Sequence, residues 1–334
     1  MAEKLYNVKV EREIADDGRF HRQDNQFKTP FGDGPDDLKA EAGRYRLYWE
    51  TNCQWSNRSS IVAELLGLGD TIEIIKVGRA DVNGTYAWTV CNEDGSPDKV
   101  SGYTYLYEFY NATDPDFEGR ATVPAIIDKQ TCKVATNYTH ELTYYLEEAF
   151  KPFHKEGAPD LLPAGLRDEI IKFNDWLFPE VNDGPYKMMF ARSLEAYEEA
   201  EAMFLRNMDY LDKRLETQRF LFGDYVTDSD VRLFTTLARY ETCYYRFLGP
   251  MVRGLRGYRN LWDYARDLYE IPAFRNNTDF RHFARYYGAI DESKAAFRTY
   301  NYRFWNEADY ERKWSEPQNR HQLSKDPYNK LLIR

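Results

Sequence analysis

A single cysteine, placed between a strand-like segment and a helix-like segment, most restricts how this chain can fold. Residues 45–49, Tyr-Arg-Leu-Tyr-Trp, have the composition of a buried strand, and residues 59–66 place apolar side chains at helical spacing. Cys53 lies between them, where the first turn of a helix leaves N–H groups unpaired and carries the positive end of the dipole. Both effects favour a thiolate, and Arg58 adds a positive charge one turn further on. The pattern therefore favours a nucleophilic Cys53 over a small buried residue.

The size and charge of the chain limit its class and its partners. A chain of 334 residues is long enough for about two domains, and 16% aromatic with 30% charged residues is typical of a globular protein. The net charge of -10 and the pI of about 5.2 argue against nucleic acid or an anionic membrane as the main partner. The first residues contain no apolar stretch typical of a signal peptide, so we expect a cytoplasmic protein.

The four cysteines give no indication of a metal site or a disulfide framework. They stand at positions 53, 91, 132 and 243, without a CxxC spacing and without a cluster of histidine and cysteine. We therefore expect no bound metal, and free thiols in a reducing compartment.

The first half of the chain predicts an α/β domain of the thioredoxin-like kind. After a polar, turn-rich N-terminal arm (1–43), residues 44–150 alternate strand and helix patterns, with an insertion between 78 and 102 that carries Trp88. We expect strands at 45–49, 71–77 and 122–128 and helices at 53–66, at about 103–110 and after 139. Val123 and Pro124 open the last of these strands, where this fold usually places a cis proline facing the active cysteine.

The second half predicts an all-α domain. Residues 151–290 contain helical patterns at 165–180, 188–221, 228–248 and 258–269, and Thr227 with Asp230 forms a capping-box pattern before the third of these. Residues 291–334 show no clear periodicity and are interpreted as a C-terminal tail packed on the body. A thioredoxin-like domain followed by an all-helical domain is the layout of the glutathione transferase fold.

Several strings occur in the order found in one family. The chain resembles the glutathionyl-hydroquinone reductases, which are the Xi class of glutathione transferases, over residues 18–288. The matching strings are residues 41–48, Cys53-x-Trp55-x-x-Arg58, and residues 114–124, 182–187, 230–237, 260–264 and 286–288.

The resemblance implies a reaction and a set of site residues. Cys53 would attack the sulfur of a glutathionyl thioether on a hydroquinone ring, and a second glutathione would resolve the mixed disulfide. Ser56 occupies the place of a resolving cysteine, which suits this route because no internal disulfide can form. Glutathione is then the co-substrate, the other partner is a small aromatic molecule, and we expect a homodimer. By position, Trp88, Arg120, Val123 and Thr139 would hold the thiol, and Tyr186 with Tyr286 or Tyr287 would contact the hydroxyls of the aromatic substrate.

The chain also departs from the family. Gln54 replaces a proline, Asn57 replaces a histidine, and Tyr138-Thr139 stands where the family has Glu-Ser. That glutamate pairs with the γ-glutamyl ammonium, an interaction worth roughly 1.5 to 3 kcal/mol. Residues 289–291 replace the family's Ser-His ending.

Three hypotheses for the function remain open at this point. The first is the thiol-dependent reductase of aromatic thioethers. The second is a transferase or dehalogenase that uses a different thiol or an aromatic electrophile, which Gln54 and Tyr138 favour. The third is a non-catalytic binding protein on the same scaffold, which the missing glutamate favours.

Overall fold

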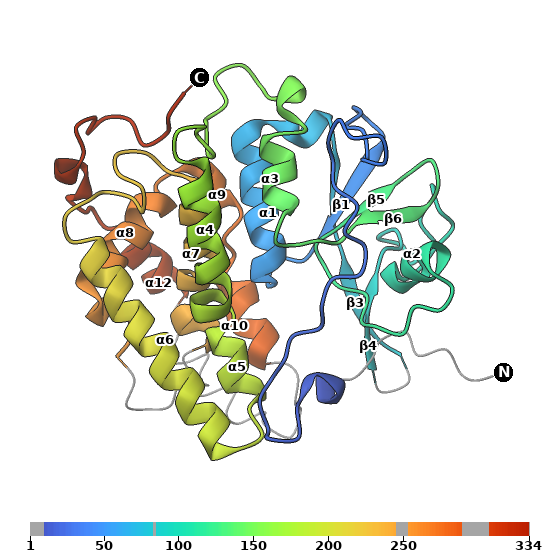
Figure 1. Ribbon diagram of the computed structural model, residues 1–334, viewed down its shortest axis with the longest axis horizontal. Helices are drawn as coiled ribbons and strands as arrows, with labels where there is room; N and C mark the ends of the chain where they lie inside the picture. The colour runs from blue at the N-terminus through green and yellow to red at the C-terminus, as the bar shows by residue number, and fades with distance from the viewer. Residues whose placement is uncertain (1–9, 83–84, 245–252, 289–306, 334) are drawn as a thin grey trace. The chain divides into compact units, whose positions relative to one another are not determined.

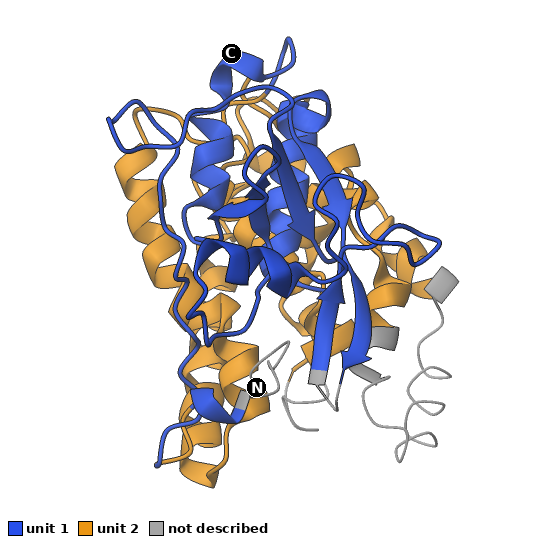
Figure 2. Cartoon of the chain, turned by 90° about the vertical axis from the view of Figure 1, so that its right-hand side faces the viewer, with its two compact units in different colours: residues 1–16, 20–158 blue, residues 17–19, 159–334 orange. Residues whose placement is uncertain are grey.

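The computed structural model describes residues 10–82, 85–244, 253–288 and 307–333 of the chain. The chain forms two compact units, one of residues 1–16 and 20–158 and one of residues 17–19 and 159–334 (Figure 2). The predicted division into four parts, with limits after residues 43, 150 and 290, stays a prediction.

Unit 1 is built on a four-stranded sheet with the strand order β2-β1-β5-β6. β1 runs parallel to β2 and antiparallel to β5, and β5 pairs with β6 as an antiparallel hairpin. All residues of β1 and β5 are buried, and both strands are mainly apolar in sequence, with one charged residue each, Arg46 and Asp128. Two helices, α1 and α3, cover one face of the sheet, and α2 covers the other (Figure 1). The elements are β1 (Tyr45–Trp49), α1 (Gln54–Leu66), β2 (Glu73–Lys76), α2 (Leu106–Thr113), β5 (Ala125–Asp128), β6 (Lys133–Thr136) and α3 (Leu142–Glu147).

The insertion in unit 1 contains a hairpin that the sequence did not predict. β3 (Gly78–Val82) and β4 (Thr85–Thr89) pair antiparallel as a separate two-stranded sheet. The side chains of β3 are exposed or half-buried, so the strand lacks the buried apolar alternation by which strands are recognised.

Unit 2 is helical, as predicted, and with unit 1 it confirms the glutathione transferase fold. The predicted helix at 188–221 is wrong, because the structure has two helices there, α5 and α6. The first ends at Phe190, and Ser193 begins the second: its hydroxyl accepts from the Ala196 N–H at 3.2 Å as an N-cap. The helices are α4 (Arg167–Leu177), α5 (Gly184–Phe190), α6 (Leu194–Arg214), α7 (Asp228–Leu237), α8 (Arg259–Tyr269), α9 (Pro272–Asn276), α10 (Phe280–Gly288) and α12 (Glu307–Trp314), with π-helical turns η4 (Phe178–Asn182) and η5 (Tyr240–Tyr244).

The predicted capping box at the start of α7 is confirmed. The Asp230 carboxylate accepts from the Thr227 N–H at 2.7 Å and from its hydroxyl at 2.8 Å. Asp230 also accepts from the Tyr264 hydroxyl at 2.7 Å, so the start of α7 is tied to α8.

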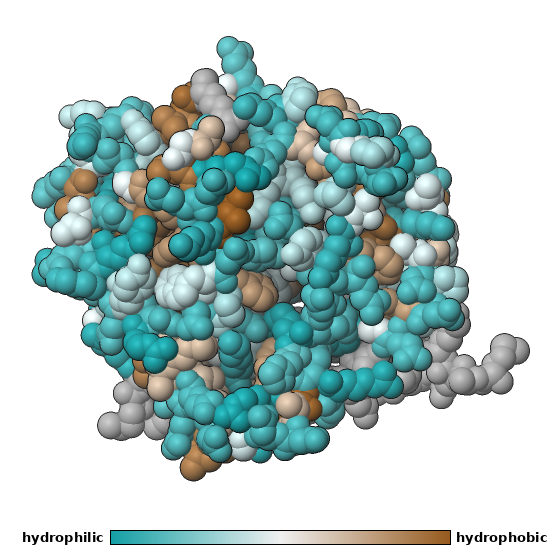
Figure 3. Space-filling model, viewed as in Figure 1, coloured by the Kyte–Doolittle hydropathy of each residue, from teal (hydrophilic) through white to brown (hydrophobic). Residues whose placement is uncertain are grey.

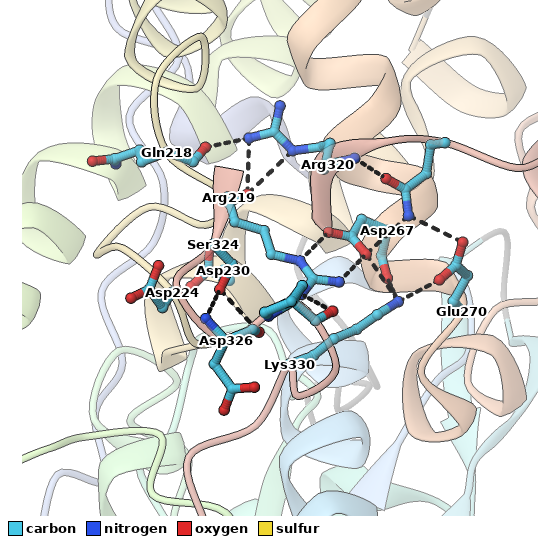
Figure 4. A network of polar contacts seen from close by, with 12 residues as sticks. Gln218, Arg219, Asp224, Asp230, Asp267, Glu270, Arg320, Ser324, Asp326 and Lys330 are labelled. Atoms are coloured by element: carbon cyan, nitrogen blue, oxygen red, sulfur yellow. Dashed lines mark hydrogen bonds and ion pairs between the residues drawn. The ribbon is translucent and has the colours of Figure 1, made fainter. Parts of the chain in front are cut away.

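A cluster of buried charges joins the C-terminal segment to α8 (Figure 4). The side chain of Asp267 is fully buried, and its two oxygens accept from the Arg219 guanidinium at 2.8 and 3.0 Å. Lys330 Nζ lies 2.9 Å from Asp267 and 2.5 Å from Glu270. Burial alone would raise the pKa of Asp267, but the hydrogen bond from Arg219 and the charge of Lys330 outweigh it and hold that pKa below its ordinary value. Within unit 2, the C-terminal segment is therefore held against α8 by ion pairs.

The face shown in Figure 3 is covered mostly by hydrophilic residues, and its hydrophobic residues form small, separate groups. Within the residues the structure describes, no helix is both long and apolar enough to cross a membrane.

Candidate active site

The predicted nucleophile lies at the start of α1. Cys53 has an extended backbone (φ -73°, ψ 113°), and its carbonyl accepts the first helical hydrogen bond, from the Asn57 N–H at 2.9 Å. It is therefore the N-cap residue, and its side chain is half-buried. This position places Cys53 at the N-terminal end of α1, where the helix dipole is positive.

The backbone before Pro124 lies against this sulfur. The Val123–Pro124 peptide bond is cis, as expected from the fold, and the Val123 carbonyl oxygen is 3.5 Å from Cys53 Sγ. The structure thus brings together two of the predicted site residues, Cys53 and Val123, which are 70 positions apart in the sequence.

A carboxylate that the sequence reasoning missed lies beside the nucleophile. Glu50 directly follows β1, and its Oε2 accepts from the Cys53 N–H at 2.9 Å, while its backbone carbonyl lies 3.1 Å from the same nitrogen. Only 5% of Glu50 is exposed. An acidic residue between a buried strand and the cysteine was the signal that could have identified it.

Arg58 connects α1 to the loop that carries Thr139. Its guanidinium donates to the Thr139 carbonyl oxygen and lies 5.4 Å from the centre of the Trp55 ring. A second guanidinium, of Arg22, lies 4.9 Å from that ring. Arg58 is buried, so its positive charge is held inside unit 1 near the start of α1.

Arg120 is paired with an acid of the N-terminal arm. Its guanidinium donates to both oxygens of Glu13, at 2.5 and 2.9 Å, and Glu13 is buried. The Gln23 side chain binds the backbone of Arg120: it accepts from the Arg120 N–H at 2.7 Å and donates to the Arg120 carbonyl at 3.2 Å. Neither Glu13 nor Gln23 was predicted as a site residue, because each is about 100 positions from its partner.

The arm also reaches the segment where the family glutamate is missing. Asn25 Oδ1 accepts from the Thr139 N–H at 3.3 Å and from the Thr139 hydroxyl at 3.2 Å. The ammonium of Lys28 lies 5.1 Å from the centre of the Tyr138 ring, a cation–π distance. A cation therefore lies against the phenol of Tyr138, at the position where the resemblance implies a carboxylate.

Trp88 lies in β4, opposite Arg79 of β3. It is buried and meets the ring of Tyr86 edge to face, with the ring centres 5.3 Å apart. These contacts place it in the hairpin of the insertion, and its predicted role in holding the thiol stays a prediction.

The predicted aromatic-site tyrosines belong to unit 2. Tyr186 lies in α5, with 9% of its surface exposed, and its hydroxyl is 3.4 Å from the hydroxyl of Tyr244. Tyr286 and Tyr287 fall in α10, but their side chains lie outside the described part of the chain. Their contact with an aromatic substrate stays a prediction.

In the part of the chain that the structure describes, no group of three or more His, Cys, Asp or Glu side chains could hold a metal ion. The candidate site in unit 1 combines Cys53, the backbone carbonyl before the cis proline, and polar side chains. These side chains come from the arm, the loop before β5 and the loop after β6. Such a set can perform thiol chemistry on a ligand that contains sulfur.

Comparison with known proteins defines the class. Residues 195–267 match the family described as "Glutathione S-transferase, C-terminal domain". A glutathione transferase from Gordonia bronchialis is similar in structure, with a TM-score of 0.80 and 34% identity, covering 89% of this chain and 91% of the other. A Xi glutathione-S-transferase from Phanerochaete chrysosporium has a TM-score of 0.78 and 33% identity, with 88% and 96% covered. The chain is a glutathione transferase by fold.

Curated relatives narrow the class to a family. The glutathionyl-hydroquinone reductase PcpF of Sphingobium chlorophenolicum is 33% identical over 81% of this chain and 86% of its own length. The glutathionyl-hydroquinone reductase YqjG of Escherichia coli is 30% identical over 81% and 84%. This chain belongs to the glutathionyl-hydroquinone reductase family, the Xi class of glutathione transferases, which is a family of glutathione-dependent enzymes.

Proposed function

We propose that this protein uses glutathione to reduce glutathionyl-hydroquinone-type aromatic thioethers, with Cys53 as the nucleophile. The observation that carries the proposal is the half-buried Cys53 sulfur at the first turn of α1, 3.5 Å from the Val123 carbonyl beside Pro124. The names of PcpF and YqjG and the glutathione-bound structure of YqjG, which has a TM-score of 0.72 with this chain at 29% identity, support it.

The reaction balances in two steps. In the first, the Cys53 thiolate attacks the glutathione sulfur of the thioether, a sulfur–sulfur bond forms and the sulfur–carbon bond breaks. The electron pair of the broken bond goes to the ring carbon, which takes up a proton, and the hydroquinone leaves. In the second, the thiolate of another glutathione attacks the mixed disulfide, releasing glutathione disulfide and restoring the Cys53 thiolate. The ring carbon is reduced, and two sulfurs are oxidised to one disulfide, one from the glutathionyl group of the thioether and one from free glutathione.

The chain's own residues can hold the thiol by its backbone and its carboxylates. The N–H and C=O of Val123 would pair with the peptide part of glutathione, and Thr139 and Arg120 would donate to carboxylates, with Trp88 packing against the ligand. A carboxylate that approaches Arg120 must share the guanidinium with Glu13 or displace it. Thr139 must likewise turn its hydroxyl away from Asn25 in order to donate to a ligand.

The aromatic part of the substrate is assigned to the tyrosines of unit 2. Tyr186, with Tyr286 or Tyr287, would contact the hydroxyls of the hydroquinone. A phenol suits this task because its ring stacks while its hydroxyl donates or accepts a hydrogen bond. Protonation of the leaving aromatic by such a group contributes roughly a hundredfold or more to the rate.

A second candidate function is a transferase or dehalogenase that uses a different thiol. Lys28 and Tyr138 favour it, because they place a cation and a phenol where the family has the carboxylate for an ammonium group. A thiol without an ammonium group would lose no binding affinity from the absence of this carboxylate.

The test is to incubate the protein with a glutathionyl-hydroquinone and glutathione, and to measure hydroquinone and glutathione disulfide together. We expect equal amounts of the two products, and a Cys53 peptide carrying one glutathione when the second glutathione is withheld. A protein that forms neither product, although its Cys53 reacts with a low-molecular-weight disulfide, contradicts the proposed substrate. Turnover with another thiol in place of glutathione supports the second candidate.

A further inference from the structure

Tyr186 is held in unit 2 by close packing of its helix. It lies in α5 two residues after Gly184, where an added Cβ would stand 2.7 Å from Cδ2 of Phe204 in α6. A contact of that length is too short for a real side chain, so glycine is what lets α5 approach α6. The backbone of α5 therefore fixes the position of Tyr186. The direction of its hydroxyl depends on the groups that the hydroxyl contacts.

This hydroxyl contacts Tyr244, the last residue of the π-helical turn η5. The two phenol oxygens are 3.4 Å apart, and the rings meet edge to face with centres 5.7 Å apart at 63°. Tyr244 is fully buried, whereas Tyr186 keeps 9% of its surface exposed. A buried phenol normally keeps a hydrogen-bond partner inside the protein.

The same π-helical turn contacts α10. Cys243 Sγ lies 3.5 Å from the Phe283 carbonyl, and the guanidinium of Arg239, the residue before the turn, lies 4.0 Å from the centre of the Phe283 ring. η5 thus joins α5, which carries Tyr186, to α10, which carries the other two tyrosines proposed for the aromatic substrate. π-helical turns interrupt regular helix geometry and are frequent at functional sites.

We infer that Tyr244 is a positioning residue for the aromatic half of the reaction, holding the Tyr186 hydroxyl through the contact between their two oxygens. The inference rests on the proposed function, since it concerns how Tyr186 serves it. Either hydroxyl could donate across this contact; in the arrangement that we infer, Tyr244 donates a hydrogen bond to the Tyr186 oxygen, and the Tyr186 proton remains available to the substrate. When that proton passes to the ring carbon of the leaving hydroquinone, the Tyr186 phenolate accepts the hydrogen bond from Tyr244 until water restores its proton.

The protonation of Tyr244 agrees with this role. Burial raises the pKa of Tyr244 well above its ordinary value, and neighbouring Tyr186 raises it further, while the charge of Arg239 acts in the opposite direction. Tyr244 therefore stays a phenol, and a phenol can donate.

The inference is tested with Tyr244→Phe, which removes one oxygen and keeps the ring. For a glutathionyl-hydroquinone we expect kcat to fall about tenfold with KM unchanged, because a group that acts on the transition state is misplaced while ground-state contacts remain. Reduction of a glutathione mixed disulfide by the same variant should stay at the wild-type rate, because that reaction needs no proton at carbon. A matched control is Tyr240→Phe, which removes from the same turn a buried hydroxyl that donates to the Arg253 carbonyl at 2.8 Å. It should leave both rates near wild type.

A double-variant cycle completes the test. In a Tyr186→Phe background, Tyr244→Phe should add no further loss, since the two hydroxyls act as one unit. The inference is overturned if Tyr244→Phe leaves kcat unchanged, lowers both reactions together, or costs the same factor with and without the Tyr186 hydroxyl. In each of these cases the wild-type rate still supports the proposed function. A wild-type protein that reduces the disulfide and leaves the thioether intact overturns the proposed function, and the inference with it.

Discussion

The carboxylate of Glu50 should raise the pKa of the Cys53 thiol, and Glu50→Gln should lower it. The Glu50 Oε2 atom is 2.9 Å from the Cys53 nitrogen, and standard bond lengths keep Cys53 Sγ within roughly 6 Å of that oxygen. A negative charge at this distance opposes a thiolate. Its removal therefore favours the thiolate, so the pKa of Cys53 must fall.

The size of the fall follows from the distance and the surroundings. At about 6 Å, two unit charges interact by about 0.7 kcal/mol in water and by about 3 kcal/mol at an effective dielectric constant of about 20. These energies correspond to shifts of about 0.5 and about 2 pKa units. Glu50 is buried and Cys53 is half-buried, so an intermediate shift of about one pKa unit is expected. Glutamine keeps the shape and an oxygen that accepts from the Cys53 N–H, so the turn from β1 to α1 should persist.

The assay is the rate of Cys53 alkylation by iodoacetamide, followed over the pH range in which thiols titrate. The other cysteines, at positions 91, 132 and 243, are replaced by serine so that one thiol reports. A matched control is Glu64→Gln, which removes the same charge from the far end of α1, about 16 Å along the helix axis. This control should leave the Cys53 pKa unchanged. A Glu50→Gln variant that keeps its fold but shows an equal or higher pKa would refute the reasoning.

Further predictions concern the thiol site and the stability of unit 2. Cys53→Ala should abolish turnover and leave the melting temperature nearly unchanged, while an equal loss of turnover from Cys243→Ala at unchanged stability would contradict the assignment of the nucleophile. Tyr138→Glu should tighten glutathione binding about tenfold or more in calorimetry, since it restores a charge-assisted partner for the ammonium; no improvement in a folded variant would point to another thiol. Asp267→Asn leaves the buried Arg219 without its partner and should cost about 3 to 5 kcal/mol in urea unfolding. The pKa of Asp267 is lowered in the folded protein, so its contribution is present above the ordinary pKa of an aspartate and is lost as the pH falls through the folded value. The stability gap between wild type and Asp267→Asn should accordingly narrow in acid, and a gap that is constant with pH would show that Asp267 contributes by packing alone.

The features that were predictable from the sequence are local ones. The strand at 45–49, the helix that follows Cys53 and the capping box of Thr227 and Asp230 each depend on neighbours a few positions away. Their patterns survive in the structure because burial and helical geometry act on adjacent residues. The thioredoxin-like order of elements follows from the same local regularities, whereas the family was identified by its resemblance in several short strings.

The sequence-based prediction failed where a local pattern was weak or where a short break interrupted it. The β3–β4 hairpin was missed because the side chains of β3 are exposed or half-buried and leave no apolar alternation. The helix expected at 188–221 merged α5 with α6, because only residues 191–193, with Ser193 as the N-cap of α6, separate two segments that are both helical. The periodicity of apolar residues alone does not reveal such a break between two helices.

Only the tertiary structure decided which distant groups meet at the candidate sites. Glu13 pairs with Arg120 across 107 positions, and Tyr186 meets Tyr244 across 58. Bringing such distant groups together costs chain entropy, and the folding of the whole unit offsets that cost. No short pattern in the sequence therefore predicts the pairing. Glu50 is an intermediate case: its place next to Cys53 is visible in the sequence, but its burial and its hydrogen bond to the Cys53 N–H follow from the turn between β1 and α1. The sequence by itself determined the fold class and the candidate nucleophile, because the patterns that indicate them involve neighbouring residues. The surroundings of Cys53 depend on contacts that exist only once the chain has folded.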